Sequence, residues 1–79
     1  MTTRYVLSTT RQRRGNPIVG EEEYIFLTQK DAEDAFDLAF DPDYIVLEAV
    51  IFKQEIDEDG DLYSESVEHS FYLDDEYAY

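Results

Sequence analysis

Few side chains in this sequence are of the types that carry out covalent chemistry. The chain of 79 residues has no Cys, and His69 is its only histidine. A Ser-His-Asp arrangement would have to use His69, which lies among serines with Glu65 and Glu68 nearby, but no nucleophile elbow or glycine-rich oxyanion loop accompanies it. We therefore interpret His69 as a partly packed strand residue whose ring pairs with a carboxylate. We expect no catalytic residue and no enzyme activity.

Alternating aspartates form the pattern that comes nearest to a metal site. Asp57, Asp59 and Asp61 alternate, and Glu68 follows Asp57 by eleven residues, which superficially matches the ligand spacing of a calcium-binding loop. The glycine that such a loop needs at its sixth position is Leu62 here, so we interpret 57–61 as a solvated hairpin turn. The three glycines of the chain match no phosphate-binding spacing. We expect no metal and no cofactor.

Acidic side chains dominate the composition. Twenty Asp and Glu face six Lys and Arg, for a net charge of −14, yet 43% of the residues are hydrophobic, including seven Tyr and five Phe. This apolar content is too high for an acidic disordered chain, so we expect one compact domain over 1–79. The charge should repel nucleic acids and anionic membranes and attract basic surfaces.

Membrane insertion and secretion are not expected. The longest apolar stretch, 44–52, is interrupted by Glu48 and is far shorter than the roughly 20 residues that span a bilayer. No apolar signal segment follows the N-terminus. We therefore expect a cytoplasmic location inside the host cell.

The basic residues are concentrated near the N-terminus. Residues 1–20 contain four Arg and no acid, for +4, whereas residues 21–79 contain all 20 acids and two Lys, for −18. Arg11, Arg13 and Arg14 form a basic loop that has two interpretations. It is an exposed hairpin tip that partly neutralises the acids of its own chain, or it makes a secondary contact with the acidic face of a second copy or a partner.

One amphipathic helix is indicated between Thr28 and Pro42. Thr28 offers an N-cap hydroxyl with Asp31 three residues later, and Pro42 disfavours helical backbone at the residue before it. Apolar residues recur with the helical period and form the stripe that should face the core: Ala32, Ala35, Phe36, Ala39 and Phe40.

Strands are expected on both sides of this helix. The strand-forming segments are 4–10, 23–27, 44–56 and 62–73, with a loop at 12–17 and a short frayed acidic tail at 74–79. The order is β-β-α-β-β, which predicts an α+β fold with one helix packed on a mainly antiparallel sheet of four strands. The segment 44–56 is apolar on both faces, which is typical of a central strand.

Simple alternation predicts which residues share a face in the last two strands. In 44–56 one face should carry Ile45, Leu47, Ala49 and Ile51, and the other should carry Tyr44, Val46, Val50 and Phe52. In 62–73 one face should carry Tyr63, Val67, Phe71 and Leu73, opposite Ser64, Ser66, Glu68 and Ser70.

The helix carries acids on the side that the core does not use. The four acids Glu33, Asp34, Asp37 and Asp41 would span roughly 12 Å at a rise of about 1.5 Å per residue. A nucleic-acid strand carries one phosphate per ~3.4 Å, so this spacing is compatible with imitation of a phosphate backbone. The alternative is a solvated face that is acidic for solubility. Further clusters of acids lie before the helix at 21–23 and after it at 57–61. The predicted partner-binding residues are Glu21, Glu22, Glu23, Glu33, Asp34, Asp37, Asp41, Asp57, Glu58, Asp59 and Asp61.

In size, acidity, expected fold and lack of catalytic groups, the chain resembles the small DNA-mimic inhibitors of phages and mobile elements. That group includes anti-CRISPR, antirestriction and uracil-DNA glycosylase inhibitor proteins. The resemblance implies an inhibitor of a basic nucleic-acid-binding protein, such as a CRISPR effector or another defence protein, with no direct nucleic-acid contact. Two alternatives stay open: a self-associating regulatory or assembly module whose 11–14 loop docks on an acidic face, and an acidic domain adapted to high salt.

Overall fold

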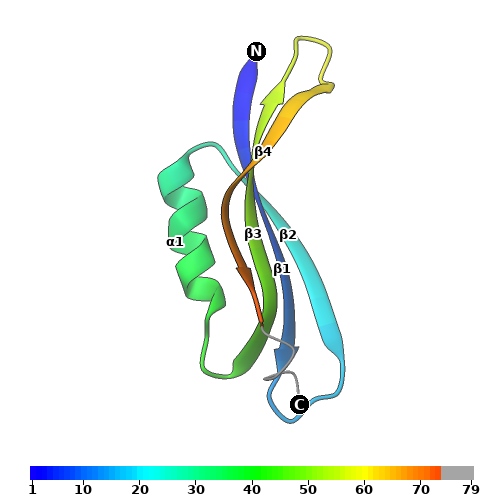
Figure 1. The fold of residues 1–79 in the computed structure, drawn as a ribbon, viewed down its shortest axis with the longest axis vertical. Helices are drawn as coiled ribbons and strands as arrows, with labels where there is room; N and C mark the ends of the chain where they lie inside the picture. Colours follow the sequence, from blue (N-terminus) through cyan, green and yellow to red (C-terminus); the bar gives the residue numbers. More distant parts are fainter. Residues whose placement is uncertain (74–79) are drawn as a thin grey trace.

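The fold is α+β, with the predicted order β-β-α-β-β (Figure 1). The computed structural model describes residues 1–73, so the predicted tail at 74–79 lies outside the described residues. The elements are β1 (Thr2–Arg13), β2 (Val19–Phe26), α1 (Gln29–Ala39), β3 (Tyr44–Ile56) and β4 (Leu62–Tyr72). Helix α1, which has 11 residues, lies along one face of the sheet (Figure 1). In residues 1–73 no helix is long and apolar enough to cross a membrane.

The sheet has the strand order β2-β1-β3-β4, and all three pairs of neighbours are antiparallel. The hairpin pairing of β1 with β2 and the central position of β3 are both confirmed. Strands β1 and β2 are longer than predicted, because the end of β1 has partners on both sides. Gln12 pairs with Val19 of β2 and with Ile45 of β3, which makes extended backbone favourable in a segment rich in turn-forming residues.

Helix α1 begins where its N-cap predicts. The Thr28 hydroxyl oxygen accepts a hydrogen bond from the Asp31 backbone N–H at 3.2 Å, which satisfies a donor that the first turn leaves free. The helix ends at Ala39, and Phe40 has non-helical backbone angles. The prediction that Asp41 extends the acidic helix face is therefore wrong, since Asp41 lies in the connection to β3.

The core lies between α1 and the central strands. It is formed by Ala32 and Phe36 of α1 together with residues of β1 and β3, and Phe26 and Phe71 pack at its edges. The buried residues contributed by β1 and β3 are Leu7, Val46, Ala49 and Ile51. Because β2 contributes no fully buried residue to this cluster, α1 is centred over β1 and β3.

Two bulges overturn the predicted assignment of residues to faces. Thr10 pairs with Glu48 whereas Arg11 pairs with Val46, so Leu47 is an extra residue in β3. An extra residue shifts the alternation by one. Val46 consequently joins Ala49 and Ile51 in the core beneath α1, although strict alternation places Val46 on the opposite face.

The same effect occurs in β4. Ile51 pairs with His69 whereas Phe52 pairs with Val67, so Glu68 is the extra residue. Phe71 packs against the core, while Val67 lies opposite Phe52 on the face that α1 does not cover. The prediction that Val67 and Phe71 share a face is therefore wrong.

The molecule is elongated. Its extents are 45 × 20 × 18 Å and its radius of gyration is 14.1 Å, against about 12 Å for a compact chain of this length. The extra length comes from an arm in which the start of β1 and the β3–β4 hairpin continue past the N-terminal end of α1 (Figure 1). Arg4 Nε donates to Gln54 Oε1 at 2.7 Å and Gln54 Nε2 donates to Glu65 Oε2 at 2.6 Å, so side-chain hydrogen bonds join the three strands of the arm.

Candidate functional site: the acidic surface

The acids of α1 are exposed to solvent. In the described residues Glu33 and Asp37 form no ion pair, and the contact of Glu33 is a hydrogen bond from Gln29 Nε2 at 3.2 Å. Asp34 pairs with Lys30 at 2.9 Å, with both side chains exposed. The hydrogen bond to Asp34, together with the negative charge of Asp34, raises the pKa of Lys30. Glu33 and Asp37 therefore present carboxylates without a basic partner in the described residues.

Asp41 has a local structural role in the connection between α1 and β3. Its Oδ1 accepts a hydrogen bond from the Asp43 backbone N–H at 2.8 Å, and its carbonyl oxygen accepts from the Tyr44 N–H at 2.9 Å. These contacts form the turn that returns the chain to the sheet. The side chain remains exposed, so its charge still contributes to the acidic surface.

The acids of β2 point to both faces of the sheet. Glu22 lies on the side of α1, whereas Glu21 and Glu23 lie on the open face. On that face Glu21 and Glu23 line an open hollow of about 370 Å³ with Ser8, Thr10 and Glu48, and Glu22, between them in the strand, also borders it. Glu48 was not among the predicted site residues. The strand order brings it there, because Thr10 of β1 pairs with Glu21 on one side and Glu48 on the other.

The acids of the β3–β4 turn lie at the tip of the arm (Figure 1). Asp57 Oδ1 accepts backbone N–H bonds from Asp59 at 2.9 Å and Asp61 at 3.0 Å, and Gly60 has φ +86°. Asp57 therefore stabilises the turn, while Glu58 and Asp59 present exposed carboxylates. Within residues 1–73 no group of three or more acidic or histidine side chains is close enough together to hold a metal ion.

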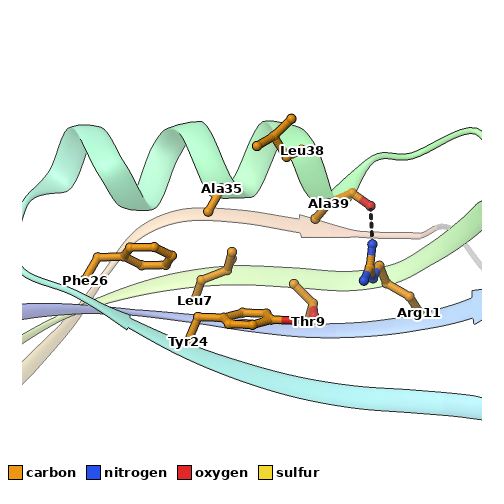
Figure 2. Close-up of a pocket in the computed structure, with 8 residues that line it drawn as sticks. All are labelled: Leu7, Thr9, Arg11, Tyr24, Phe26, Ala35, Leu38 and Ala39. Carbon is orange, nitrogen blue, oxygen red and sulfur yellow. Dashed lines mark hydrogen bonds between the residues drawn. The ribbon is translucent and has the colours of Figure 1, made fainter.

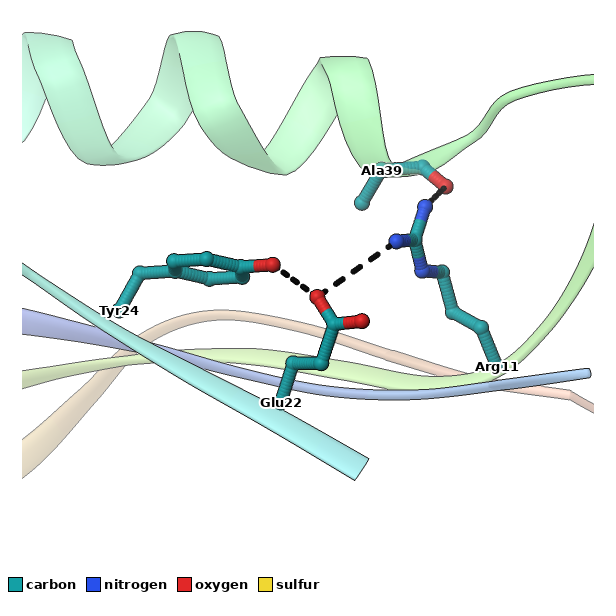
Figure 3. A network of polar contacts seen from close by, with 4 residues as sticks. All are labelled: Arg11, Glu22, Tyr24 and Ala39. Atoms are coloured by element: carbon teal, nitrogen blue, oxygen red, sulfur yellow. Dashed lines mark hydrogen bonds and ion pairs between the residues drawn. The ribbon is translucent and has the colours of Figure 1, made fainter. Parts of the chain in front are cut away.

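Arg11 of β1 contacts α1 and β2 (Figure 3) and also β3. Its Nη1 donates to the Ala39 carbonyl oxygen at 3.1 Å, and its Nη2 lies 3.7 Å from Glu22 Oε2, which also accepts a hydrogen bond from the Tyr24 hydroxyl. The guanidinium lies 4.3 Å from the centre of the Tyr44 ring. Because the last turn of α1 contains no basic residue, Arg11 supplies from β1 the positive charge that favours a helix C-terminus.

The other two arginines of the basic loop differ from each other. Arg14 Nε donates to the Pro42 carbonyl oxygen at 2.8 Å, and the Arg14 backbone N–H donates to Asp43 at 2.9 Å. Arg13 is exposed and makes no ion pair or side-chain hydrogen bond within the described residues. Arg11 and Arg14 thus hydrogen-bond to the end of α1 and to the α1–β3 connection of their own chain.

His69 packs against the helix. Its ring stacks on Phe36 with 4.2 Å between ring centres, so the contact that positions it is aromatic rather than the predicted carboxylate. Strict alternation already places His69 on the same face as Phe71, and the bulge at Glu68 instead moves Val67 to the opposite face.

The acidic groups occupy three separate regions of the molecule. Glu33 and Asp37 lie on α1 over one face of the sheet, Glu21, Glu23 and Glu48 lie on the opposite face, and Glu58 and Asp59 lie at the tip of the arm. The structure therefore does not gather all predicted partner-binding residues into one patch. Protein-family models, curated proteins and solved structures were compared with this chain, and none of them matches it.

Proposed function

We propose that this chain is an acidic protein inhibitor that binds the positively charged, nucleic-acid-binding groove of another protein. It presents carboxylates where a nucleic acid presents phosphates. A defence protein such as a CRISPR effector is the setting that the resemblance in size and composition suggests. One contrast carries the proposal. Glu33 and Asp37 are exposed and form no ion pair in the described residues, whereas Arg11 and Arg14 donate to backbone carbonyl oxygens elsewhere in the chain.

The charge balance of the surface supports this function. Seventeen of the 20 acidic residues lie within residues 1–73, and two of these, Glu22 and Asp34, form ion pairs. Arg11 and Arg14 donate to the carbonyl oxygens of Ala39 and Pro42. Few of the acids in the described residues are therefore neutralised by an ion pair within the chain.

An uncompensated charge of this size destabilises a compact chain. Like charges four residues apart on a helix cost a few tenths of a kcal/mol, and Glu33 and Asp37 are such a pair. Solubility needs a much smaller net charge than −14, since about 2–8 serves a small domain. Binding to a basic partner surface offsets the repulsion among these carboxylates, and electrostatic steering by the same charges speeds association.

The helix offers a spacing that suits a phosphate-binding groove. Glu33 and Asp37 are separated by about 6 Å along the helix axis, at a rise of about 1.5 Å per residue. Successive phosphates of one strand are ~3.4 Å apart along the duplex axis, so the two carboxylates approximate alternate phosphates. Self-association through the 11–14 loop gains no comparable support, because Arg11 and Arg14 already contact their own chain.

Two charge-reversal variants test which carboxylates act. One is Glu33→Lys with Asp37→Lys on α1, and its matched control is Glu58→Lys with Asp59→Lys at the tip of the arm. Both pairs are exposed, and both variants change the net charge by the same amount. The assay measures fluorescence anisotropy of labelled DNA bound to purified nucleic-acid-binding effectors while the chain is titrated in.

The parent chain should displace DNA from an effector at near-stoichiometric ratio, and more weakly as salt is added. If each helix carboxylate meets a desolvated cation worth about 1.5 kcal/mol, the α1 variant should lose roughly a hundredfold in affinity. The arm variant should lose far less. Equal losses in both variants would mean that only net charge matters, and the helix would not be the mimic surface.

A further inference from the structure

An open groove lies between α1 and the edge strand β2 (Figure 2). Its volume is about 300 Å³, its floor is formed by Leu7 and Thr9, and Tyr24 of β2 faces Ala35 and Leu38 of α1 across it. The groove exists because α1 is centred over β1 and β3, and because its residues on the β2 side include two alanines, which leave space above β2. Arg11 and Ala39 border the groove near the C-terminal end of α1 (Figure 2).

The floor of this groove contains a polar atom without a partner. Thr9 is 2% exposed, and no group within the described residues hydrogen-bonds its hydroxyl oxygen. A buried polar group left without a hydrogen bond destabilises the fold. The fold does not need this hydroxyl, because valine has the same shape and suits a strand equally well. A bound group that reaches the floor would give the hydroxyl its missing partner.

The rim of the groove is apolar and open to solvent. Leu38 is 79% exposed and Tyr24 is 44% exposed. A small molecule would be largely enclosed by its pocket, typically to 70–90% of its surface, and would leave these rim residues uncovered. A polypeptide segment can fill the groove with one side chain and cover the rim with its neighbours.

Acidic residues flank the apolar groove on both sides. Glu22 of β2 pairs with Thr9 and so lies beside the floor. Asp31 and Asp34 precede Leu38 by seven and four residues, which puts them on the same stripe of α1 as Leu38. The cations beside these acids, Arg11 and Lys30, are already matched by Glu22 and Asp34. Asp31 therefore has no ion pair within the described residues, and the chain as a whole stays strongly negative. An occupant with positive charge is therefore favoured, and a second copy of this acidic chain is repelled.

We propose that this groove receives an apolar side chain of the basic partner, with Lys or Arg residues on either side of it meeting the acids of the rim. The inference rests on the proposed function and adds an apolar anchor to it. A cavity of roughly 150 Å³ accommodates benzene, so this groove has room for a leucine or phenylalanine side chain. The anchor supplies affinity that salt does not screen, and the carboxylates supply orientation and speed.

Two synthetic peptides separate the anchor from the charge. The probes are acetyl-Lys-Lys-Phe-Lys-Lys-amide and the same peptide with Ser in place of Phe, titrated into the full chain labelled with ¹⁵N and methyl ¹³C. The Phe peptide should bind about tenfold more tightly, since burying a phenylalanine stabilises by about 1.5–3 kcal/mol. Its ring should shift the methyl signals of Leu7, Ala35 and Leu38 and give intermolecular contacts to them.

A pair of surface variants tests the location. Leu38→Ser should remove most of the preference for the Phe peptide, whereas Val67→Ser, on the face that α1 does not cover, should retain it. Both residues are more than half exposed, so neither substitution should unfold the chain. Thr9→Val should keep the fold and weaken the Phe peptide, because the peptide backbone then loses a hydrogen-bond partner at the floor.

The outcomes distinguish this inference from the function on which it rests. Equal binding of both peptides, with the groove methyl signals unmoved, would overturn the anchor and leave charge-driven binding intact. Binding of neither peptide at low salt would count against the proposed function itself. Equal binding of an uncharged Phe peptide would overturn the basic partner. Groove shifts that depend on protein concentration without peptide would identify a second copy as the occupant and overturn the proposal.

Discussion

Arg11 offers the sharpest test of how this fold is held together. Its side chain, 18% exposed, hydrogen-bonds the carbonyl oxygen of Ala39, pairs with Glu22 and lies over the ring of Tyr44. Arg11→Ala removes all three contacts at once. The change should release the C-terminal end of α1 from β1 and should lower the free energy of unfolding.

The size of this effect follows from the contacts. A hydrogen bond from a charged group contributes about 1.5–3 kcal/mol. The cation–π contact adds about 0.5–1 kcal/mol. The ion pair is long at 3.7 Å and half exposed on the Glu22 side, and contributes about 0–1 kcal/mol. Because contacts made by one side chain do not add fully, we expect a total loss of about 2–3 kcal/mol.

Arg13→Ala is the matched control, since it removes the same charge from a neighbouring exposed residue whose side chain makes no ion pair or hydrogen bond within the described residues. Its effect should stay within about 0.5 kcal/mol. Urea unfolding followed by circular dichroism measures both values, and each kcal/mol corresponds to about 4–8 °C in Tm for a domain of this size. Equal destabilisation by the two variants would show that Arg11 acts only through net charge, and would refute the structural role.

Three further predictions concern single side chains. Thr9→Val should raise the free energy of unfolding by about 1 kcal/mol, because it deletes a buried hydroxyl without a partner in the described residues. Thr3→Val in the same strand should lower it, because Thr3 donates a hydrogen bond to Glu55 at 2.8 Å, and urea unfolding measures both variants. Thr28→Ala should cost about 1 kcal/mol by removing the N-cap of α1, and calorimetry should show a lower Tm. Asp34→Asn should bring the raised pKa of Lys30 back toward its ordinary value in an NMR titration of the side-chain amine, and an unchanged pKa would mean that the ion pair does not form in solution.

Local signals in the sequence predicted the elements well. Thr28 and Pro42 marked the two ends of the helical region, and the apolar content of 44–56 indicated a central strand. Each of these signals acts over a few residues, through a side-chain hydrogen bond, a steric restriction or a pattern of burial. The prediction of where α1 ends was less exact, because Phe40 already has non-helical backbone angles and Asp41 lies outside the helix.

The assignment of residues to faces failed where bulges intervene. Leu47 and Glu68 are the extra residues at two of the three register shifts in the sheet, and no glycine or proline marks either position. Whether a bulge forms depends on how well the two strands pack beyond it. That packing is a property of the whole sheet and not of the local segment. This is why Val46 faces α1 and Val67 lies on the opposite face, against the prediction from alternation.

The candidate site was predicted in its residue types but not in its arrangement. The exposure of Glu33 and Asp37 follows from the helical period. The hollow formed by Glu21, Glu23 and Glu48 depends on the strand order, and the contact of Arg11 with the end of α1 depends on where β1 passes beneath the helix. Such contacts join residues far apart in the chain, which local patterns do not encode.

The central claim is that the chain occupies a site made for nucleic acid, so competition is its most direct test. The measurement is the apparent Kd of the chain for a purified nucleic-acid-binding effector at increasing concentrations of that effector's DNA or RNA. Mimicry predicts that the apparent Kd rises in proportion to the nucleic acid and that no ternary complex forms. A Kd that is independent of nucleic acid, with chain, effector and nucleic acid bound together, would contradict the account.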